Sequence, residues 1–341
     1  MLHFDSDYME GAHPSIIERL AETNLEQTPG YGTDAYCESA KARIREACEA
    51  PNAEVFFLVG GTQTNATVID QLLHPWEGVV AVESAHINGH EAGAVESCGH
   101  KILQLPGTDG KLIPQQVASY YDTWRAGESW DHAVTPGVVY ISHPTEKGTL
   151  YSLAELEELS CICHERDMRL FVDGARLGYG LAGARTDVAL PDIARLADAF
   201  YIGGTKVGAL FGEAVVFTKP QLADHFFTSM KRRGAVLAKG RLLGLQFDTL
   251  FTEGLYLDIA RHGVDLGQRL AAGFEAAGYE LAWKTPTNQV FVVMDAAQRD
   301  ALREHATFET WEELADGRLI MRFVTSWATR EQDVEELLAL L

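Results

Sequence analysis

Lys206 has the surroundings in this sequence that most suggest chemistry. It stands in Gly203-Gly204-Thr205-Lys206-Val207-Gly208, directly after the apolar run 199–202. A lysine amine has an ordinary pKa of about 10.4 and usually extends into solvent. Flanked by glycines and apolar residues at the end of a strand, it is better suited to forming a Schiff base with a carbonyl group. A surface lysine is the alternative for this residue taken alone.

A carboxylate follows another apolar run. Asp173 comes directly after MRLFV (168–172). In an open α/β sheet, ligands bind beyond the carboxyl ends of the strands, so a side chain at this place points into the site. A carboxylate there can pair with the protonated ring nitrogen of a cofactor. The alternative is a structural Asp in a turn or at the start of a helix.

A glycine-rich turn follows a third run. Gly60-Gly61-Thr62 comes after EVFFLV (54–59) and opens a helical pattern. The free N–H groups and positive dipole end of a helix start can hold a phosphate. An ordinary strand–glycine–helix turn gives the same pattern, and the Gly-Lys-Ser/Thr of a P-loop is absent.

Together the three features are more specific than any one of them. Phosphate cradle, acid and lysine follow three strands in that order, which matches pyridoxal-phosphate enzymes of the aspartate-aminotransferase type. In those enzymes the cradle holds the phosphate, the acid holds the pyridine nitrogen and the lysine carries the cofactor.

Seven short apolar runs predict the strands of one sheet: 54–59, 78–84, 100–107, 137–143, 168–174, 199–204 and 213–218. Most of them lack alternation, which is typical of strands buried on both faces of a mostly parallel sheet. Amphipathic segments between several runs predict helices, and Ser152 and Glu155 have capping-box spacing at the start of one. The pattern predicts an α/β fold.

After about residue 219, helical patterns dominate at 219–233, 240–251 and 255–278. Two strand-like runs (288–294 and 318–327) and a final helix follow, with Thr329 and Gln332 again at capping-box spacing. We therefore predict a large domain over residues 1–245, whose N-terminal segment contributes to the active site, and a smaller α+β domain over 246–341. No Pro/Gly-rich linker marks the boundary.

The chain resembles the threonine aldolase / β-eliminating lyase family along nearly its whole length, most closely the low-specificity L-threonine aldolase branch. The matching stretches are SDYMEGAHP (6–14), QTPGYGTD (27–34), FFLVGGTQTN (56–65), AHINGHEAGA (85–94), VDGARLGYGL (172–181), YIGGTKVGALFGEA (201–214), RGAVLAKGRLLG (233–244) and MRFVTSWAT (321–329). Val207 departs from the family, in which a polar Asn is expected after the lysine.

The resemblance implies that pyridoxal 5′-phosphate is the cofactor and that Lys206 carries it. Asp173 is then the partner of the ring nitrogen, and Gly60, Gly61 and Thr62 form the phosphate cradle.

For the substrate, the resemblance implies that Ser6, Arg176 and Arg322 bind the carboxylate, to which the planar fork of arginine is suited. For Arg322 the alternative is a structural arginine that faces solvent. Arg176 also belongs to the implied catalytic and cofactor-binding residues. His86 is implied to stack on the cofactor ring and to act near the substrate's β-carbon, as a base or as the holder of a water.

Further basic residues are implied to reach the phosphate, some from a neighbouring subunit. Lys231, Lys239 and Arg241 are the candidates, and the sequence does not choose among them. Tyr31 and His132 are weaker site candidates that we also expect near a subunit interface. The family works as dimers paired into tetramers, so we expect a homo-oligomer.

Two other ligands fit parts of the sequence. His86, His90 and Glu91 contain a pair of histidines four residues apart, but the order differs from His-Glu-x-x-His and no third zinc ligand is evident, so we predict no metal. Residues 178–183 match the dinucleotide pattern G-x-G-x-x-G. They do not follow the first strand of a βαβ unit, and Asp198 precedes its strand, so NAD is not expected.

The composition narrows the class of protein further. Lys and Arg total 28 against 49 acids, a net charge of −21, which disfavours a nucleic-acid partner. No apolar run reaches the roughly 18 residues of a membrane helix, and the N-terminus lacks a signal-peptide pattern. Five cysteines without framework spacing favour a reducing compartment, so we expect a cytoplasmic protein.

The sequence therefore predicts cleavage of L-threonine, L-allo-threonine or a related β-hydroxy-α-amino acid to glycine and an aldehyde. The alternative on the same scaffold is a β-eliminating or other amino-acid lyase, because these enzymes share their cofactor anchors and differ in the bond that breaks. A non-catalytic binding protein on this fold is a third possibility.

Overall fold

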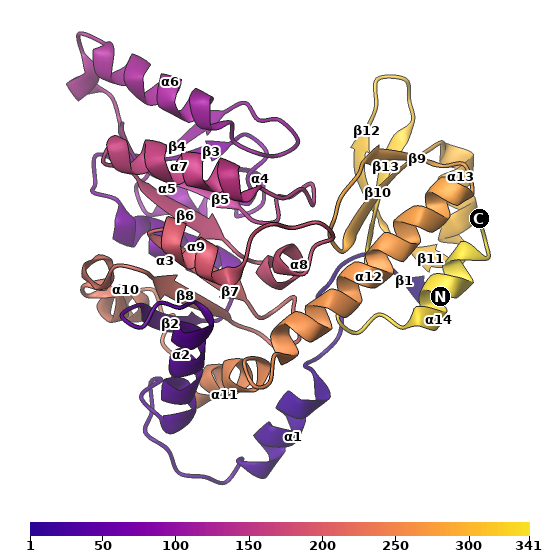
Figure 1. Cartoon of the computed structure of the whole chain (residues 1–341), viewed down its shortest axis with the longest axis horizontal. Coiled ribbons are helices and arrows are strands. Elements are labelled where there is room, and N and C mark those ends of the chain that lie inside the picture. The colour runs from indigo at the N-terminus through magenta and orange to yellow at the C-terminus, as the bar shows by residue number, and fades with distance from the viewer.

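A seven-stranded sheet forms the centre of the computed structural model, which describes all residues 1–341 (Figure 1). The strand order is β2-β8-β7-β6-β5-β3-β4. Strand β8 runs in the opposite direction to the other six, which are parallel to one another. The strands are β2 (Glu54–Leu58), β3 (Glu77–Val82), β4 (Ile102–Leu105), β5 (Thr135–Ser142), β6 (Arg169–Asp173), β7 (Ala199–Gly203) and β8 (Glu213–Phe217). Each overlaps one of the seven predicted runs, with β3 and β5 beginning one and two residues earlier, so the mostly parallel sheet is confirmed.

Helices cover this sheet on both sides in Figure 1. Every residue of β7 and β8 is buried, as the unbroken apolar runs predict for strands that are covered on two faces. The helices of this part are α1 (Pro14–Glu22), α2 (Ala35–Ala47), α3 (Gly61–Leu72), α4 (His86–Gly89), α5 (Ala94–Ser97), α6 (Pro114–Ala126), α7 (Leu153–Glu165), α8 (Leu177–Leu181), α9 (Leu190–Leu196), α10 (Phe226–Arg232) and α11 (Arg241–Leu250), with short 3-10 turns at Trp130–His132 and Pro220–Ala223.

The C-terminal part contains a separate antiparallel sheet of order β12-β13-β10-β9. Its strands are β9 (Glu280–Trp283), β10 (Gln289–Met294), β12 (Glu309–Glu313) and β13 (Leu319–Val324), and its helices are α12 (Leu255–Ala276), α13 (Ala296–Arg303) and α14 (Glu331–Leu338). The two predicted strands correspond to β10 and β13. The edge strands β9 and β12 were not predicted, because they are short and have no fully buried residue.

Helix α12 connects the two parts. Tyr256, Ile259 and Val264 pack into the large hydrophobic core, whereas Leu270 and Phe274 pack into the core of the small sheet. The predicted boundary at residue 245 lies inside α11 and stays a prediction. Both the fold class and the smaller α+β part are as the sequence predicts.

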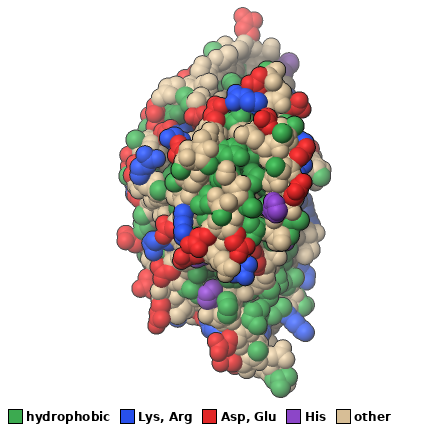
Figure 2. All heavy atoms as spheres, turned by 90° about the vertical axis from the view of Figure 1, so that its right-hand side faces the viewer, with side chains coloured by type: hydrophobic (Ala, Val, Ile, Leu, Met, Phe, Trp, Pro, Cys, Tyr) green, Lys and Arg blue, Asp and Glu red, His purple; other side chains and the backbone are tan.

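The N-terminal segment begins in the small part and then crosses to the large one. Strand β1 (Leu2–His3) pairs in parallel with β11 (Ala306–Thr307), and Phe4 is buried in the small core. The N–H of His13 donates to the carbonyl of Gly208 at 2.8 Å. Residues 5–12 therefore run between the two parts of the chain. Figure 2 shows the face formed by the C-terminal part, where acidic and basic side chains are interspersed.

The two predicted capping boxes have different outcomes. Ser152 caps α7 as predicted, because its hydroxyl accepts the N–H of Glu155 while the Glu155 carboxylate accepts the N–H of Ser152. The box at Thr329 is wrong. The Thr329 hydroxyl accepts the N–H of Ser326 instead, and α14 begins two residues later with Arg330 as its N-cap.

Candidate active site

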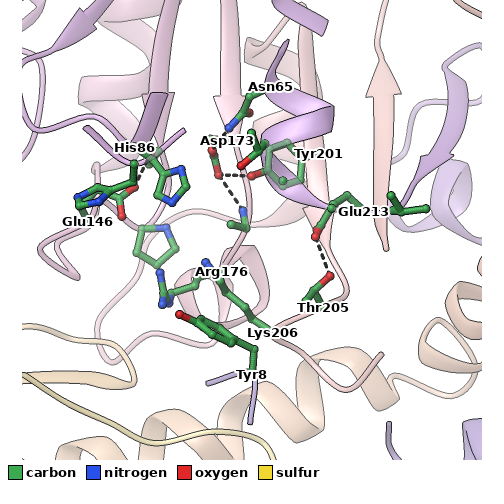
Figure 3. A pocket seen from close by; sticks show the side chains of 18 of the residues that line it. Tyr8, Asn65, His86, Glu146, Asp173, Arg176, Tyr201, Thr205, Lys206 and Glu213 are labelled. Carbon is green, nitrogen blue, oxygen red and sulfur yellow. Dashed lines mark hydrogen bonds between the residues drawn. The ribbon is translucent and has the colours of Figure 1, made fainter. Parts of the chain in front are cut away.

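Most of the predicted catalytic and binding residues meet at one cavity of about 440 Å³, at the carboxyl ends of the parallel strands and beside the small sheet. Gly60, Gly61, Thr62, His86, Asp173, Arg176, Lys206 and Arg322 all line it. Ser6 does not line the cavity, and its role stays a prediction. Figure 3 shows the central part of this arrangement.

The Asp173 carboxylate is held by four hydrogen-bond donors. It lies at the end of β6, where Oδ2 accepts the Tyr140 hydroxyl and the Asn65 side-chain amide, the latter at 2.9 Å. Oδ1 accepts the Tyr201 hydroxyl and the N–H of Ala175. A carboxylate offers about four lone-pair sites. A protonated ring nitrogen would therefore join or replace the Tyr201 hydroxyl, the phenol of the two that lines the cavity.

A chain of side chains connects Asp173 to His86. Asn65 donates to both Asp173 and Glu91, and the second of these bonds is 2.7 Å long. Glu91, whose side chain is fully buried, lies 2.7 Å from Nδ1 of His86. A carboxylate at Nδ1 fixes the proton there and leaves Nε2 as the free nitrogen. The sequence led us to consider Glu91 as a metal ligand and to miss this role.

The surroundings of His86 raise its pKa above the ordinary value. Burial alone would lower the pKa, but the hydrogen bond to Glu91 and the charges of Glu146 and Asp173 outweigh it. The imidazole lies at the cavity beside His90, with ring centroids 5.6 Å apart. The structure holds no group of three or more His, Cys, Asp or Glu residues that could bind a metal.

Lys206 follows β7 by three residues and extends into the cavity (Figure 3). Burial, together with the nearby Arg176 guanidinium, lowers the pKa of its amine. Its Nζ lies 5.8 Å from the centre of the Tyr8 ring. A lowered pKa leaves more of the amine uncharged, the form that attacks a carbonyl. Val207, the departure from the family pattern, is fully buried and does not line the cavity.

A buried acid lies behind the loop that carries the lysine. Glu213, the first residue of β8, accepts the Thr205 hydroxyl at 2.8 Å and the N–H of Gly204 at 3.2 Å. Burial raises the pKa of Glu213 to about 8. Glu213 is a site residue that the sequence pattern does not reveal, because an acid just before an apolar run looks like an ordinary turn residue.

Arg176 is already engaged by a carboxylate of the chain itself. Its Nε and Nη2 donate to the two oxygens of Asp7 at 2.7 and 3.0 Å, and Asn288 donates to the same acid. Burial opposes the charge of Arg176, but Asp7 outweighs it and raises the pKa of the guanidinium. Only Nη1 remains for a ligand. Two of the three guanidinium nitrogens that were predicted to bind the substrate therefore already bind Asp7. Asp7 itself was not predicted as a site residue.

Arg322 reaches the cavity from β13 in the small part. Its Nη1 donates to Gln289 Oε1 at 3.3 Å, and Nη2 forms an ion pair with Glu309. The guanidinium lies 5.1 Å from the centre of the Trp311 ring. Its side chain is buried, so the alternative of a solvent-facing structural arginine is wrong.

The first turn of α3 can accept an anion. Gly60 is the N-cap without a side-chain cap, and the helix ladder begins only with the N–H of Thr64. The backbone N–H groups of Gly61, Thr62 and Gln63 therefore have no acceptor within the helix. A Cβ placed on Gly60 would meet nothing within 4 Å, so a ligand can approach the backbone at this position.

The remaining candidates from the sequence lie away from the cavity in this chain. None of Lys231, Lys239, Arg241, Tyr31 and His132 lines the cavity. Lys231 lies over the exposed Tyr31 ring at 4.6 Å, and Arg241 donates to the backbone and hydroxyl of Thr23. Their predicted contribution to a neighbouring subunit's site stays a prediction.

The glycines of the dinucleotide pattern have a packing role. Gly178 and Gly180 lie in the short helix α8, where an added Cβ would come within about 3 Å of Tyr256 and Pro144, respectively. The pattern therefore allows close packing of α8, and its match to a dinucleotide motif is incidental.

The fold and this site place the chain among enzymes with the aspartate-aminotransferase architecture. Aspartate aminotransferase from Thermus thermophilus superposes with a TM-score of 0.72 at 14% identity, which concerns the fold alone. A profile of the β-eliminating lyase family matches residues 3–297. The chain belongs to this family.

Individual relatives are similar over the full length. The low specificity L-threonine aldolase of Pseudomonas sp. (strain NCIMB 10558) is 31% identical over 98% of this chain and 96% of its own. That of Pseudomonas aeruginosa is 30% identical over 98% and 95%. The threonine aldolase structure from Leishmania major is 41% identical, with a TM-score of 0.97 over 100% of this chain and 98% of that one.

The family implies pyridoxal 5′-phosphate as the cofactor, and the residues of the cavity fit this group. Lys206 provides an amine that faces the cavity, and the first turn of α3 provides backbone N–H groups without acceptors. Asp173, labelled in Figure 3, provides a carboxylate for a ring nitrogen in the same cavity.

Proposed function

We propose that this chain is a pyridoxal-phosphate-dependent aldehyde-lyase that cleaves L-threonine, L-allo-threonine or a related β-hydroxy-α-amino acid to glycine and an aldehyde. The observation that carries the proposal is the convergence of Lys206, Asp173 and the first turn of α3 on one cavity with two arginines. The names of the relatives from Pseudomonas and Leishmania major support the substrate class.

Three groups of the chain hold the cofactor. Lys206 would bind its aldehyde carbon, Asp173 would accept the ring N–H, and the N–H groups of Gly61 and Thr62 would bind the phosphate. Pyridoxal phosphate, when bound, supplies an electron sink for the negative charge that develops on the substrate's α-carbon.

The arginines orient the substrate. Arg322 and the free Nη1 of Arg176 bind the α-carboxylate from two sides of the cavity. With the amine and the carboxylate both fixed, the arginines would determine which bond of the α-carbon occupies the position from which the cofactor can accept its electrons. Placing the Cα–Cβ bond there favours its cleavage over loss of the α-proton.

His86 moves the proton. Its Nε2 takes the proton of the β-hydroxyl group, directly or through a water, as the Cα–Cβ bond breaks and the oxygen becomes the carbonyl of the aldehyde. Glu91 stabilises the charge that His86 gains, because it accepts the Nδ1 proton at 2.7 Å. The α-carbon then receives one proton, which completes glycine.

The test is one assay with purified holoenzyme. L-threonine, L-allo-threonine and L-serine are supplied separately, and aldehyde plus glycine is measured against pyruvate or 2-oxobutyrate. Aldehyde and glycine in equal amounts are expected. Formation of 2-oxo acids without an aldehyde would instead assign the chain to the β-eliminating lyases, which break a bond at Cβ on the same scaffold.

Assembly and location belong to the same proposal. Dimers paired into tetramers would bring the exposed Lys231, Lys239 and Tyr31 of one chain near the phosphate of another. We place the protein in the cytoplasm, and no helix of the structure combines the length and apolar character needed to cross a membrane. Sedimentation at several protein concentrations tests the assembly, and a fully active monomer of 37.5 kDa would contradict it.

A further inference from the structure

The guanidinium of Arg322 is held in place by neutral groups. Gln289, which is fully buried, accepts from Nη1 at 3.3 Å, and the Trp311 ring covers the guanidinium at 5.1 Å. Phe291 packs edge-on against Trp311, with centroids 5.2 Å apart, and fixes that ring in turn. Two of the contacts that hold Arg322 therefore come from uncharged groups.

The only acid that pairs with Arg322 is Glu309. The two residues are direct cross-strand neighbours, because Glu309 in β12 faces Arg322 in β13 in the antiparallel register. The ion pair uses one guanidinium nitrogen, while Nε of Arg322 and Nε2 of Gln289 are buried without an acceptor. Glu309 therefore leaves some of the hydrogen-bond donors at Arg322 without an acceptor.

The pair at Arg176 is built in the opposite way. Asp7 is fully buried, binds Arg176 through two parallel hydrogen bonds and accepts a third from Asn288. Bidentate pairs of this kind are the stronger ones. Glu309, in contrast, has a side chain that is 49% exposed, and it begins an edge strand of the small sheet. It can turn into solvent without leaving a buried charge of its own.

We propose that Glu309 occupies the place of the substrate's α-carboxylate on Arg322 in the free enzyme and is displaced when an amino acid binds. A buried arginine without a counter-charge is unfavourable, so a carboxylate is needed there in both states. Glu309 supplies it when the cavity is empty. The residue therefore sets the affinity of the site for amino acids and favours ligands that bring a carboxylate. This inference rests on the proposed function, in which Arg322 binds that carboxylate.

The probes for the test are glycine and methylamine, two amines that differ only in the carboxylate. Their dissociation constants are measured by calorimetric titration of the holoenzyme, for the wild type and for Glu309→Gln and Glu309→Ala. Glu313→Gln is the matched control, because Glu313 lies on the same strand, is exposed and has no ion-pair partner. Thermal unfolding of all variants verifies that they are folded.

Removing the competing charge should tighten glycine binding by about two- to five-fold, in the range that a partly exposed ion pair allows. Methylamine binding should not change, and kcat/KM for L-threonine should rise with the affinity for glycine. Glu313→Gln should bind both probes as the wild type does.

Weaker or unchanged glycine binding in both Glu309 variants would overturn the inference, because Glu309 would then position Arg322 or have no part in binding. An equal gain for methylamine would overturn it as well, since the effect would not depend on the carboxylate. Failure of the proposed function is distinguishable: in that case the wild type itself releases no aldehyde from any β-hydroxy amino acid.

Discussion

The two ends of the cavity are built on different principles. At the Asp173 end, all groups come from the large part of the chain, and the hydrogen bonds form a continuous network from the two tyrosine hydroxyls through Asn65 and Glu91 to His86. At the Arg322 end, the groups come from the small part, and the one ion pair is half-exposed.

This difference indicates which end of the cavity is preorganised and which end must adapt to a ligand. A network of buried groups with fixed partners costs little reorganisation during a reaction, which suits the end where charge develops. A half-exposed carboxylate on a buried arginine can be exchanged, which suits the end where ligands enter and leave. Substitutions at the first end should therefore alter turnover, and those at the second end should alter affinity.

The largest effect is expected for Asp173→Asn. The amide cannot stabilise a protonated ring nitrogen as a carboxylate does, so turnover should fall on the order of 10²-fold or more, while the protein retains some cofactor. Steady-state kinetics and the cofactor absorbance check this. Glu96→Gln, an exposed acid of α5, is the control. Near-normal turnover of Asp173→Asn would mean that another group holds the ring nitrogen.

Arg322→Lys tests the other end of the cavity. Lysine retains the charge but lacks the planar fork, so the carboxylate should be held less well, and kcat/KM should fall on the order of 10–10²-fold. Most of the change should appear in KM, and the cofactor content should stay the same. A variant that loses its cofactor yet binds glycine normally would show that Arg322 belongs to the phosphate or to the scaffold.

Glu91→Gln should change the pH dependence more than the rate. A base must be neutral, so activity falls as the pH drops through the pKa of His86, which Glu91 raises above 6.5. Removing the charge of Glu91 lowers that pKa, and the acidic limb of kcat/KM should shift to lower pH.

The plateau of that profile should also fall several-fold, because the weakened histidine is a poorer base. The profile is measured between about pH 5 and 9, where histidine titrates. A limb that stays in place would show that His86 is not the group that titrates there.

Much of this architecture could be predicted from the sequence, for a simple physical reason. Strands buried on both faces must be apolar throughout, and residues that follow parallel strands meet at one edge of the sheet. Lys206, Asp173 and Gly60 each follow such a strand, so their convergence could be anticipated. The same rule does not detect β9 and β12. They are the two edge strands of the small sheet, so they need no apolar run.

Two of the acids that were missed, Asp7 and Glu309, have partners that only the tertiary structure brings close. Asp7 and Arg176 are 169 positions apart, and Glu309 meets Arg322 only through the pairing of β12 with β13. Nothing local distinguishes these acids from solvated ones. The wrong capping box at Thr329 has a local cause, because its hydroxyl accepts the N–H of Ser326 in the turn that precedes the helix.

The smallest effect is expected for Tyr140→Phe. Asp173 would retain three donors, Asn65, Tyr201 and the N–H of Ala175, so the carboxylate should stay in position and turnover should fall by less than about five-fold. The free energy of unfolding should fall by about 1–2 kcal/mol, because the lost bond reaches a charged acceptor. Both quantities come from steady-state kinetics and urea unfolding of the same preparation.

Tyr151→Phe is the matched control for Tyr140→Phe. Tyr151 is also a buried tyrosine, but its hydroxyl accepts the N–H of Leu112 away from the cavity. Stability should fall to a similar extent while turnover stays at the wild-type level. The comparison of the two ends depends on this result, because a preorganised network tolerates the loss of one donor among four. Should Tyr140→Phe lose as much turnover as Asp173→Asn, the single phenol, and not the network, would determine the state of the carboxylate.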